Sequence, residues 1–203
     1  HNYCLNGENV SLETILKRED QVSFNIDESI DYKASDLDVE ILYEDDYLLI
    51  VNKPAGIIIH DDGTNDTNTL SNAVSKYYQE QGINRKVRCV HRIDKDTTGI
   101  VIFAKDFITE ASLCYEIEQH NIKREYLALT SNSFSQDKGT ISYRLGRDRH
   151  NAKKYRVSST GVEAITNYQI KERLKNKISL VSLLLETGRT HQIRAHFAYS
   201  GHP

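Results

Sequence analysis

The sequence predicts an α+β protein built on a mixed, largely antiparallel sheet. Alternating apolar segments that are typical of strands follow one another along most of the chain, with few helical segments between them. The 203 residues are 38% hydrophobic and 27% charged, which is typical of a globular protein that buries one sizeable core. We find no apolar run of roughly 18 residues and no signal-peptide pattern, so we expect a cytoplasmic protein that does not contact membranes.

Composition divides the chain into three parts. Residues 1–28 contain an Asn6-Gly7 turn signal and a short alternating apolar run, and they are too short to fold alone. Residues 29–38 are acidic with few apolar side chains, which is typical of a linker. Residues 39–203 carry the remaining strand and helix signals, so we expect them to form the main domain.

The main domain begins with a strand pattern. Residues 47–60 form an apolar run interrupted by the Lys-Pro-Ala-Gly segment 53–56, which predicts a strand, a turn and a second strand. Thr67 or Thr69 can cap a helix that ends at Gly82. The remaining elements are expected in this order: a strand at 100–102, a helix at 107–119, strands at 125–130, 139–145, 164–170 and 178–187, and a closing helix at 190–200.

Charge is distributed unevenly along the chain. The formal net charge is −3, but the first 50 residues contain 13 acidic and 3 basic side chains, so the remainder carries +7. Clustered cations can form a surface that binds a nucleic-acid backbone, or they can simply lie on a solvated loop face. Charge alone leaves both interpretations open. The densest cluster consists of Arg144, Arg147, Arg149, Lys153, Lys154 and Arg156.

A polar segment from His91 to Gly99 lies directly before a predicted buried strand. Asp94 at its centre is flanked by Arg92 and Lys95. Neighbouring cations favour the ionised carboxylate, which suits a nucleophile better than a proton donor. A salt-bridged turn feeding the strand would explain the same residues, and the spacing alone leaves both interpretations open.

A second segment, 187–196, runs from a strand end into the closing helix, where main-chain N–H groups can hold an anion. His191 and Arg194 are three residues apart and therefore share one helical face. A capping helix with charged ends is the alternative interpretation. A metal site is disfavoured, because no acidic ligand accompanies the histidines at 91, 191, 196 and 202. The three cysteines never form a CxxC pair and are expected to be reduced thiols.

Three long motifs resemble those of one enzyme family. HRIDKDTTGIVIFAK is similar to the HRLD-containing signature of the RluA-type RNA pseudouridine synthases, GRTHQIRAHFAYSGHP to their C-terminal signature, and YEDDYLLIVNKPAGIIIH to their upstream KPAG element. With KREYLAL between them, the resemblance covers residues 39–203. It implies the pseudouridine synthase fold, in a catalytic domain that is incomplete at its C-terminal end because the family continues with a Gly-Asp element and further strands. Residues 1–28 resemble the last part of an α-L RNA-binding module, so we expect a partial module there.

The resemblance implies that specific uridines in structured RNA are isomerised to pseudouridine. This reaction gains no atom and includes no redox step, so neither a cofactor nor a metal is expected. The implied substrate is large-subunit ribosomal RNA, with transfer RNA as the alternative. We expect the protein to act as a monomer.

The motifs also imply roles for single residues. Asp94 matches the indispensable catalyst, which acts near ribose C1′ or C2′ of a flipped uridine. Tyr126 matches the aromatic residue that stacks on uracil, and Arg194 matches the cation that pairs with the catalytic carboxylate. The expected RNA contacts are His91, Arg92, Arg124, Arg189, Thr190, His191 and Gln192, together with Arg147 and Lys154 of the basic cluster.

Two other functions compete with this interpretation. A catalytically silent RNA-binding protein could keep the fold, although binding alone does not require Asp94, Tyr126 and Arg194 together. A hydrolase could use Asp94 and Asp96 as an acid–base pair, since their two-residue spacing puts both on one side of an extended loop. Release of free uracil would distinguish this hydrolase from an isomerase.

Overall fold

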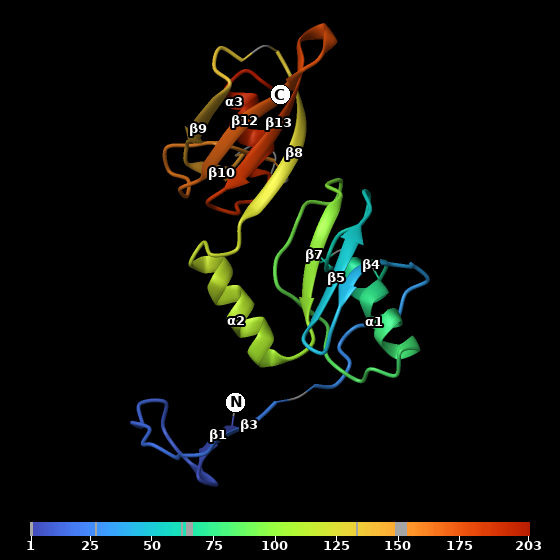
Figure 1. Cartoon of the computed structure of the whole chain (residues 1–203), viewed down its shortest axis with the longest axis vertical. Coiled ribbons are helices and arrows are strands. Elements are labelled where there is room, and N and C mark those ends of the chain that lie inside the picture. The colour runs from blue at the N-terminus through green and yellow to red at the C-terminus, as the bar shows by residue number, and fades with distance from the viewer. Residues whose placement is uncertain (1, 27, 62, 64–66, 133, 149–153) are drawn as a thin grey trace. The chain divides into compact units, whose positions relative to one another are not determined.

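The computed structural model describes residues 2–26, 28–61, 63, 67–132, 134–148 and 154–203. The chain forms two compact units, His1–Cys114 and Tyr115–Pro203, each of which is described by itself (Figure 1). Every strand pairing in the described ranges is antiparallel, and three α-helices accompany the sheets. The predicted α+β class is therefore confirmed. No helix among these residues is long and apolar enough to cross a membrane.

A small antiparallel sheet forms the start of the first unit. Asn6 and Gly7 have φ angles of 52° and 85°, the left-handed conformation that an Asn-Gly hairpin turn requires. The predicted turn is confirmed, and the alternating run after it forms the third strand. The strands, in the order β2-β1-β3, are β1 (Asn2–Leu5), β2 (Glu8–Asn9) and β3 (Val22–Asn25).

The main sheet of the first unit has one face buried. Along β5, alternate side chains Leu49, Val51 and Lys53 are fully buried, as the period of two in a strand dictates. Helix α1 (Leu70–Glu80) lies beside this sheet, and Thr69 caps it by accepting a hydrogen bond from the main-chain N–H of Asn72 (Figure 1). The strands, in the order β4-β5-β7-β6, are β4 (Glu40–Glu44), β5 (Leu48–Lys53), β6 (Arg88–Cys89) and β7 (Gly99–Ala104).

The second strand predicted after the Lys-Pro-Ala-Gly turn is wrong. The carbonyl groups of Ile58 and Ile59 accept hydrogen bonds from the main-chain N–H groups of Leu70 and Ser71, at 2.9 Å each. These carbonyls therefore satisfy the first turn of α1, whose N–H groups have no partner inside the helix. Because the acceptors are used in this way, residues 57–60 form no strand.

The acidic segment predicted to be a linker is bound along α1 and β6. Side chains of α1 donate to its carbonyl groups, from Asn72 to Lys33 at 2.8 Å and from Ser75 to Tyr32 at 2.6 Å. Just before it in the chain, Glu28 makes a two-bond ion pair with the buried Arg88, with N–O distances of 2.6 and 2.9 Å. Acidic composition favours disorder in an isolated segment, but here these tertiary hydrogen bonds hold the main chain in place.

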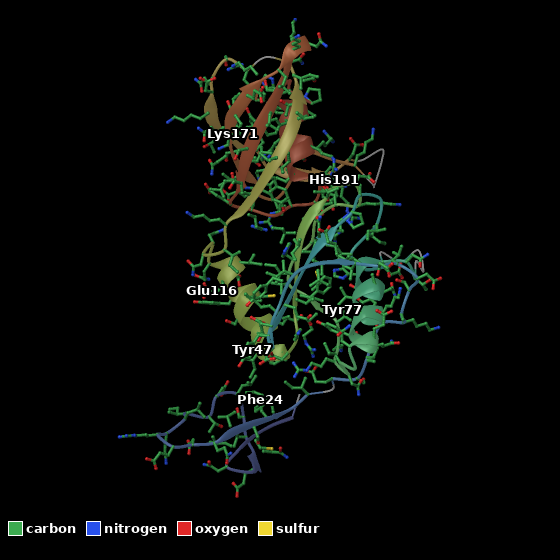
Figure 2. The ribbon with its side chains drawn as sticks, turned by 45° about the vertical axis from the view of Figure 1, so that its right-hand side comes forward. Phe24, Tyr47, Tyr77, Glu116, Lys171 and His191 are labelled. Carbon is green, nitrogen blue, oxygen red and sulfur yellow. The ribbon has the colours of Figure 1, made fainter. Side chains whose placement is uncertain are left out.

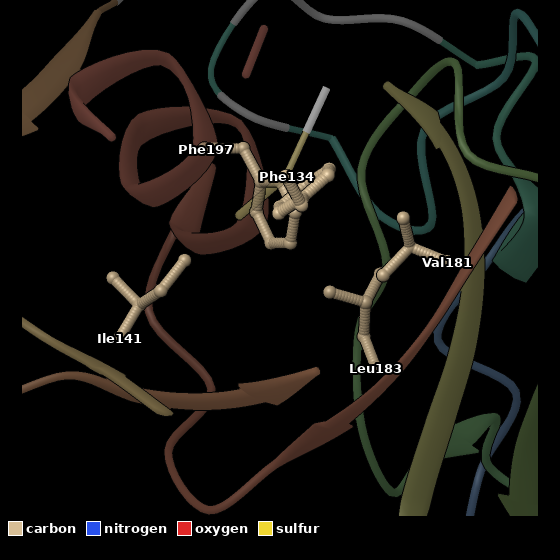
Figure 3. Close-up of a cluster of buried hydrophobic side chains, with 5 residues drawn as sticks. All are labelled: Phe134, Ile141, Val181, Leu183 and Phe197. Carbon is tan, nitrogen blue, oxygen red and sulfur yellow. The ribbon is translucent and has the colours of Figure 1, made fainter. Parts of the chain in front are cut away.

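The second unit is a four-stranded sheet that carries a helix on its buried face. Its core consists of Phe134, Ile141, Val181, Leu183 and Phe197 (Figure 3). The sheet order is β8-β13-β12-β9, and a separate two-stranded ribbon pairs β10 with β11. The elements are α2 (Phe107–Glu118), which crosses the boundary between the units, β8 (Arg124–Ser131), β9 (Lys138–Ser142), β10 (Leu145–Arg147), β11 (Tyr155–Val157), β12 (Ile165–Arg173), the short helix η1 (Lys175–Lys177), β13 (Ile178–Leu185) and α3 (Gln192–Tyr199).

Most predicted elements of this unit are confirmed, with one division. The run 139–145 was expected to be a single strand, but it is shared between β9 and β10. Leu145 instead pairs with Val162 through two main-chain hydrogen bonds of 2.8 and 2.9 Å. Because this bridge and the pairing with β11 engage Leu145 elsewhere, the strand cannot continue along β12.

We predict that Gly161→Ala destabilises the second unit by about 1–3 kcal/mol, because an added Cβ would meet main-chain atoms that cannot move away. The Cβ would lie 2.3 Å from the carbonyl carbon and oxygen of Leu145. Gly146→Ala is the matched control, since its Cβ would lie 3.3 Å from the side chain of Ser158. Urea unfolding should show the larger loss for Gly161→Ala, and equal losses would contradict this account.

Candidate active site

Asp94 lies in the loop that connects β6 to β7. The loop closes in a turn in which the N–H of Thr97 donates to the carbonyl of Asp94 at 3.1 Å. Gly99 then begins β7 with a φ of 122°, which a residue with a side chain rarely adopts. Asp94 itself is half-buried and the preceding Ile93 is buried, so the loop is anchored at its centre.

Lys53 ties the Asp94 loop to the turn that follows β5. Its side chain is fully buried, and its ammonium group donates to the carbonyls of Pro54, Ile57 and Lys95 at 2.9, 3.0 and 2.8 Å. The Lys95 carbonyl also accepts from the N–H of Gly56 at 3.0 Å. Two donors of the Lys-Pro-Ala-Gly turn therefore hold the peptide directly after Asp94.

The charge of Lys53 interacts with the carboxylates of the Asp94 loop. Burial lowers the pKa of Lys53, and the carboxylates of Asp96 and Asp94 oppose this effect. All three ammonium hydrogens are used on main-chain carbonyls, so this lysine positions the loop and does not react. The sequence contained the signal, a lysine at the end of an apolar strand before a turn, but its contact with residue 95 is visible only in the structure.

His91 and Arg92 precede Asp94 in the same loop. The Nε2 atom of His91 accepts from the N–H of Ile102 at 3.3 Å, so this ring supports the pairing of the loop with β7. Arg92 is exposed. Burial lowers the pKa of His60, and the charge of Arg92 lowers it further. Of the residues expected to contact RNA in this unit, Arg92 is thus presented to solvent, and His91 is engaged with the main chain.

The start of α3 is held by a buried network centred on Gln192. The Gln192 side chain accepts from Thr187 at 2.7 Å and from the N–H of Arg189 at 3.0 Å, and it donates to Thr166 at 3.0 Å. Thr166 also contacts the Nδ1 atom of the fully buried His196 at 3.0 Å. Gln192 was expected among the RNA contacts, but it is 3% exposed and its side-chain amide is bonded within the protein.

His191, which is labelled in Figure 2, caps the start of α3. Its backbone is left-handed, with a φ of 54°. Such a backbone costs on the order of 1 kcal/mol for a residue with a side chain and is frequent at functional sites. Its ring lies edge-on to Tyr155 of β11, with centroids 5.8 Å apart. Arg189 donates to the Glu163 carbonyl at 3.0 Å, and Arg194 is exposed on α3.

Arg124 and Tyr126 lie on β8, two residues apart and therefore on one face of the sheet. Tyr126 packs against the core cluster of this unit. The strand register places Arg124 opposite Leu185, the last residue of β13, so Arg124 lies beside the loop that leads into α3. The two residues that sequence reasoning singled out on this strand are therefore both partly buried on the α3 side.

The described members of the basic cluster lie in the β10-β11 ribbon or directly next to it. Arg144 donates to the Gly161 carbonyl at 2.7 Å, and Arg156 pairs with Asp148 at 3.4 Å. Arg147 and Lys154 are exposed, with the Nε atom of Arg147 donating to the Tyr155 hydroxyl at 3.2 Å. The other two members of the cluster, Arg149 and Lys153, lie outside the described residues.

The predicted site residues thus form two groups, one in each unit. His91, Arg92 and Asp94 belong to the first unit, and Tyr126, Arg194 and the other expected contacts belong to the second. An open hollow of about 720 Å³ in the first unit contains none of them, because it is lined by residues 46–47, 82–85 and 105–106. No group of three metal-binding side chains occurs within the described ranges.

The fold and the motif loops define a class of RNA-modifying enzymes, and comparisons with known proteins agree. The family model described as RNA pseudouridylate synthase matches residues 47–199. The chain therefore belongs to the RNA pseudouridine synthases, a family of isomerases. The family members to which it is similar include the ribosomal large subunit pseudouridine synthase D.

Two curated relatives illustrate the similarity. The chain is 42% identical over 205 residues to the "Uncharacterized RNA pseudouridine synthase YhcT" of Bacillus subtilis, a match that covers 98% of this chain and 67% of that protein. It is 35% identical over 183 residues to the "Ribosomal large subunit pseudouridine synthase D" of Haemophilus ducreyi, covering 90% of this chain and 56% of that protein. The chain thus spans between about half and two thirds of these relatives.

Solved structures support the fold. The "Human RNA Pseudouridylate Synthase Domain Containing 1" matches with a TM-score of 0.67 and 24% identity, over 82% of this chain and 66% of that chain. The "Human RNA Pseudouridylate Synthase Domain Containing 4" matches with the same TM-score and 23% identity. These matches confirm the predicted pseudouridine synthase fold.

We predict that Lys53→Met destabilises the first unit by about 3 kcal/mol, because removing a buried cation leaves main-chain carbonyls without their donor. Thermal unfolding measures the loss. Lys76→Met is the matched control: Lys76 pairs with the exposed Asp38 at 2.8 Å, and such a surface pair contributes little. Equal melting temperatures for the two variants would show that Lys53 does not support the loop.

Proposed function

We propose that this chain converts specific uridines in structured RNA to pseudouridine, with Asp94 as the essential carboxylate. The observation that carries the proposal is the clamped Asp94 loop, which lies inside the segment matched by the RNA pseudouridylate synthase family. A nucleophile must be held in one geometry to be effective, and two hydrogen bonds to the Lys95 carbonyl fix the peptide beside it.

The reaction exchanges one bond for another. The bond between uracil N1 and ribose C1′ breaks, the base turns, and a bond from C5 to C1′ forms, with a proton leaving C5 and one joining N1. A carboxylate next to the sugar can bond to C1′ as in retaining glycosidases, or it can remove the C2′ proton. Both routes place the Asp94 carboxylate beside the ribose.

The target uridine must leave its stack before Asp94 can reach the glycosidic bond. Arg92 is exposed in the Asp94 loop and is suited to occupy the space that the base leaves, with His91 supporting the loop behind it. Tyr126 provides an aromatic face for the flipped uracil. Arg194, an exposed cation, is assigned to the Asp94 carboxylate in the active enzyme because a guanidinium can bond two oxygens at once.

The remaining expected contacts divide by their surroundings. Arg124, Arg189, Thr190 and His191 are assigned to the RNA, since they lie at or near the loop before α3. Gln192 is assigned to positioning this loop, because its amide is buried within the protein.

The substrate is proposed to be large-subunit ribosomal RNA, with transfer RNA as the alternative. Relatives at 34–36% identity whose names specify the ribosomal large subunit support this choice. The enzyme is proposed to act as a cytoplasmic monomer. Residues 1–28 are proposed to belong to an RNA-binding module, 29–38 to be an acidic connecting segment, and 39–203 to form the catalytic domain.

The decisive experiment for the substrate is to map isomerised uridines across total RNA from cells with and without the protein. Uridines that are isomerised only when the protein is present identify the RNA. The purified chain should then isomerise the same position in a stem-loop copied from that RNA. If it released free uracil in place of pseudouridine, the hydrolase interpretation would replace the proposal.

We predict that Asp94→Asn abolishes pseudouridine formation and keeps most of the RNA affinity. Asparagine preserves size and hydrogen bonding but removes the negative charge and the nucleophilic oxygen. Asp96→Asn is the matched control, which should retain substantial activity because the family pattern gives that position no catalytic role. The measurements are pseudouridine per RNA and equilibrium binding at one salt concentration. Turnover by Asp94→Asn, or an equal collapse of both variants, would overturn the assignment.

We also predict that RNA affinity falls steeply with salt despite the acidic total charge. Arg147 and Lys154 are exposed at the β10-β11 ribbon. Each phosphate that a cation neutralises contributes about 0.7–0.9 to the slope of log affinity against log salt. Substituting both with glutamine should therefore reduce the slope by up to about 2. The pair Lys171 and Lys175, changed in the same way, is the control, and an unchanged slope in the first variant would move the RNA path elsewhere.

A further inference from the structure

Gly188, in the loop before α3, lies directly beside the side chain of Arg124. A Cβ added there would lie 2.3 Å from Nη1 and 3.3 Å from Cζ of Arg124. The φ of Gly188 lies outside the left-handed region, so its backbone conformation does not demand glycine. The guanidinium of Arg124 therefore lies across the Cα of Gly188, and only a residue without a side chain leaves it there.

Among the described residues, no carboxylate forms an ion pair with Arg124 in this place. Its Nε atom is buried without a hydrogen-bond partner, and none of the ion pairs among the described residues includes it. A buried donor left unpaired costs about 1–3 kcal/mol, so the position is not explained by stability. A guanidinium that no described carboxylate neutralises is suited to bind an anion from outside the protein.

The strand geometry indicates which anion. Arg124 and Tyr126 share one face of β8, and two residues along a strand span about 6.6 Å. If the flipped uracil stacks on Tyr126, as the proposed function states, a cation at this separation lies within reach of a phosphate of the same nucleotide. Arg124 can form two parallel bonds to phosphate oxygens, which a lysine cannot.

We propose that Arg124 binds a phosphate flanking the target uridine and that Gly188 is the positioning residue that keeps its guanidinium in place. This inference rests on the proposed function. It assigns a role to Gly188 and a specific ligand, the backbone phosphate of the flipped nucleotide, to Arg124.

The test is a double-mutant cycle with Gly188→Ala, Arg124→Met and the double variant, measured as affinity for the mapped RNA stem-loop. Arg124→Met should weaken binding roughly 10-fold or more and reduce the salt slope by about 0.7. Gly188→Ala should weaken binding in the wild-type background and cost nothing further in Arg124→Met. Lys171→Met is the control, an exposed cation that Figure 2 shows well apart from His191 within the same unit.

A second probe reports the phosphate directly. Stem-loops carrying an uncharged methylphosphonate at either phosphate that flanks the target uridine should bind wild type about 10-fold more weakly at one position. Arg124→Met and Gly188→Ala should be insensitive to that replacement, a difference that a general loss of folding does not produce. The idea is overturned if Gly188→Ala and Arg124→Met are additive, or if both variants keep the wild-type sensitivity.

The same assay separates this inference from the proposed function. Wild-type protein that isomerises the stem-loop while the cycle is additive leaves the proposed function standing and removes the role of Gly188. Wild-type protein that isomerises no RNA removes both.

Discussion

Three main-chain carbonyl groups converge on the ammonium group of Lys53, and the loop that carries Asp94 has its shape because of this convergence. A buried cation is costly unless every hydrogen finds an acceptor. The turn at residues 54–57 supplies two of the acceptors, and the Asp94 loop supplies the third. Strand β5, the turn and the Asp94 loop therefore form one cooperative structure, in which loss of any one part leaves the others unsatisfied.

The second unit is organised by the same physical rule with different groups. Gln192 and His196 are buried polar side chains, and each finds partners on β12 or in the segments beside it. Burial lowers the pKa of His196, so the neutral ring is favoured. This network fixes the start of α3 and leaves Arg189 and Arg194 exposed, which separates the residues that support the loop from those that can meet RNA.

The basic side chains near the site differ in whether they contact other groups of the protein. Arg88, Arg144 and Arg156 are engaged by carboxylates or carbonyls of the protein. Arg92, Lys154 and Arg194 are exposed. Charge counts from the sequence treat these cations alike, although the buried Arg88, which pairs with Glu28, cannot meet an external phosphate as an exposed cation can.

Local patterns in the sequence determined most of the secondary structure and the identity of the motif loops. Thr69 caps α1, Asn6 and Gly7 form the hairpin turn, and the strand run 178–187 forms β13, because each depends on neighbours a few residues away. Long-range contacts decided the rest. The Ile58 and Ile59 carbonyls serve α1 and form no strand, and the acidic segment is bound because Asn72 and Ser75 reach its main chain. The clamp of Lys53 on residue 95 and the seat of Arg124 over Gly188 join positions 42 and 64 residues apart, a distance over which no periodicity or local propensity carries information.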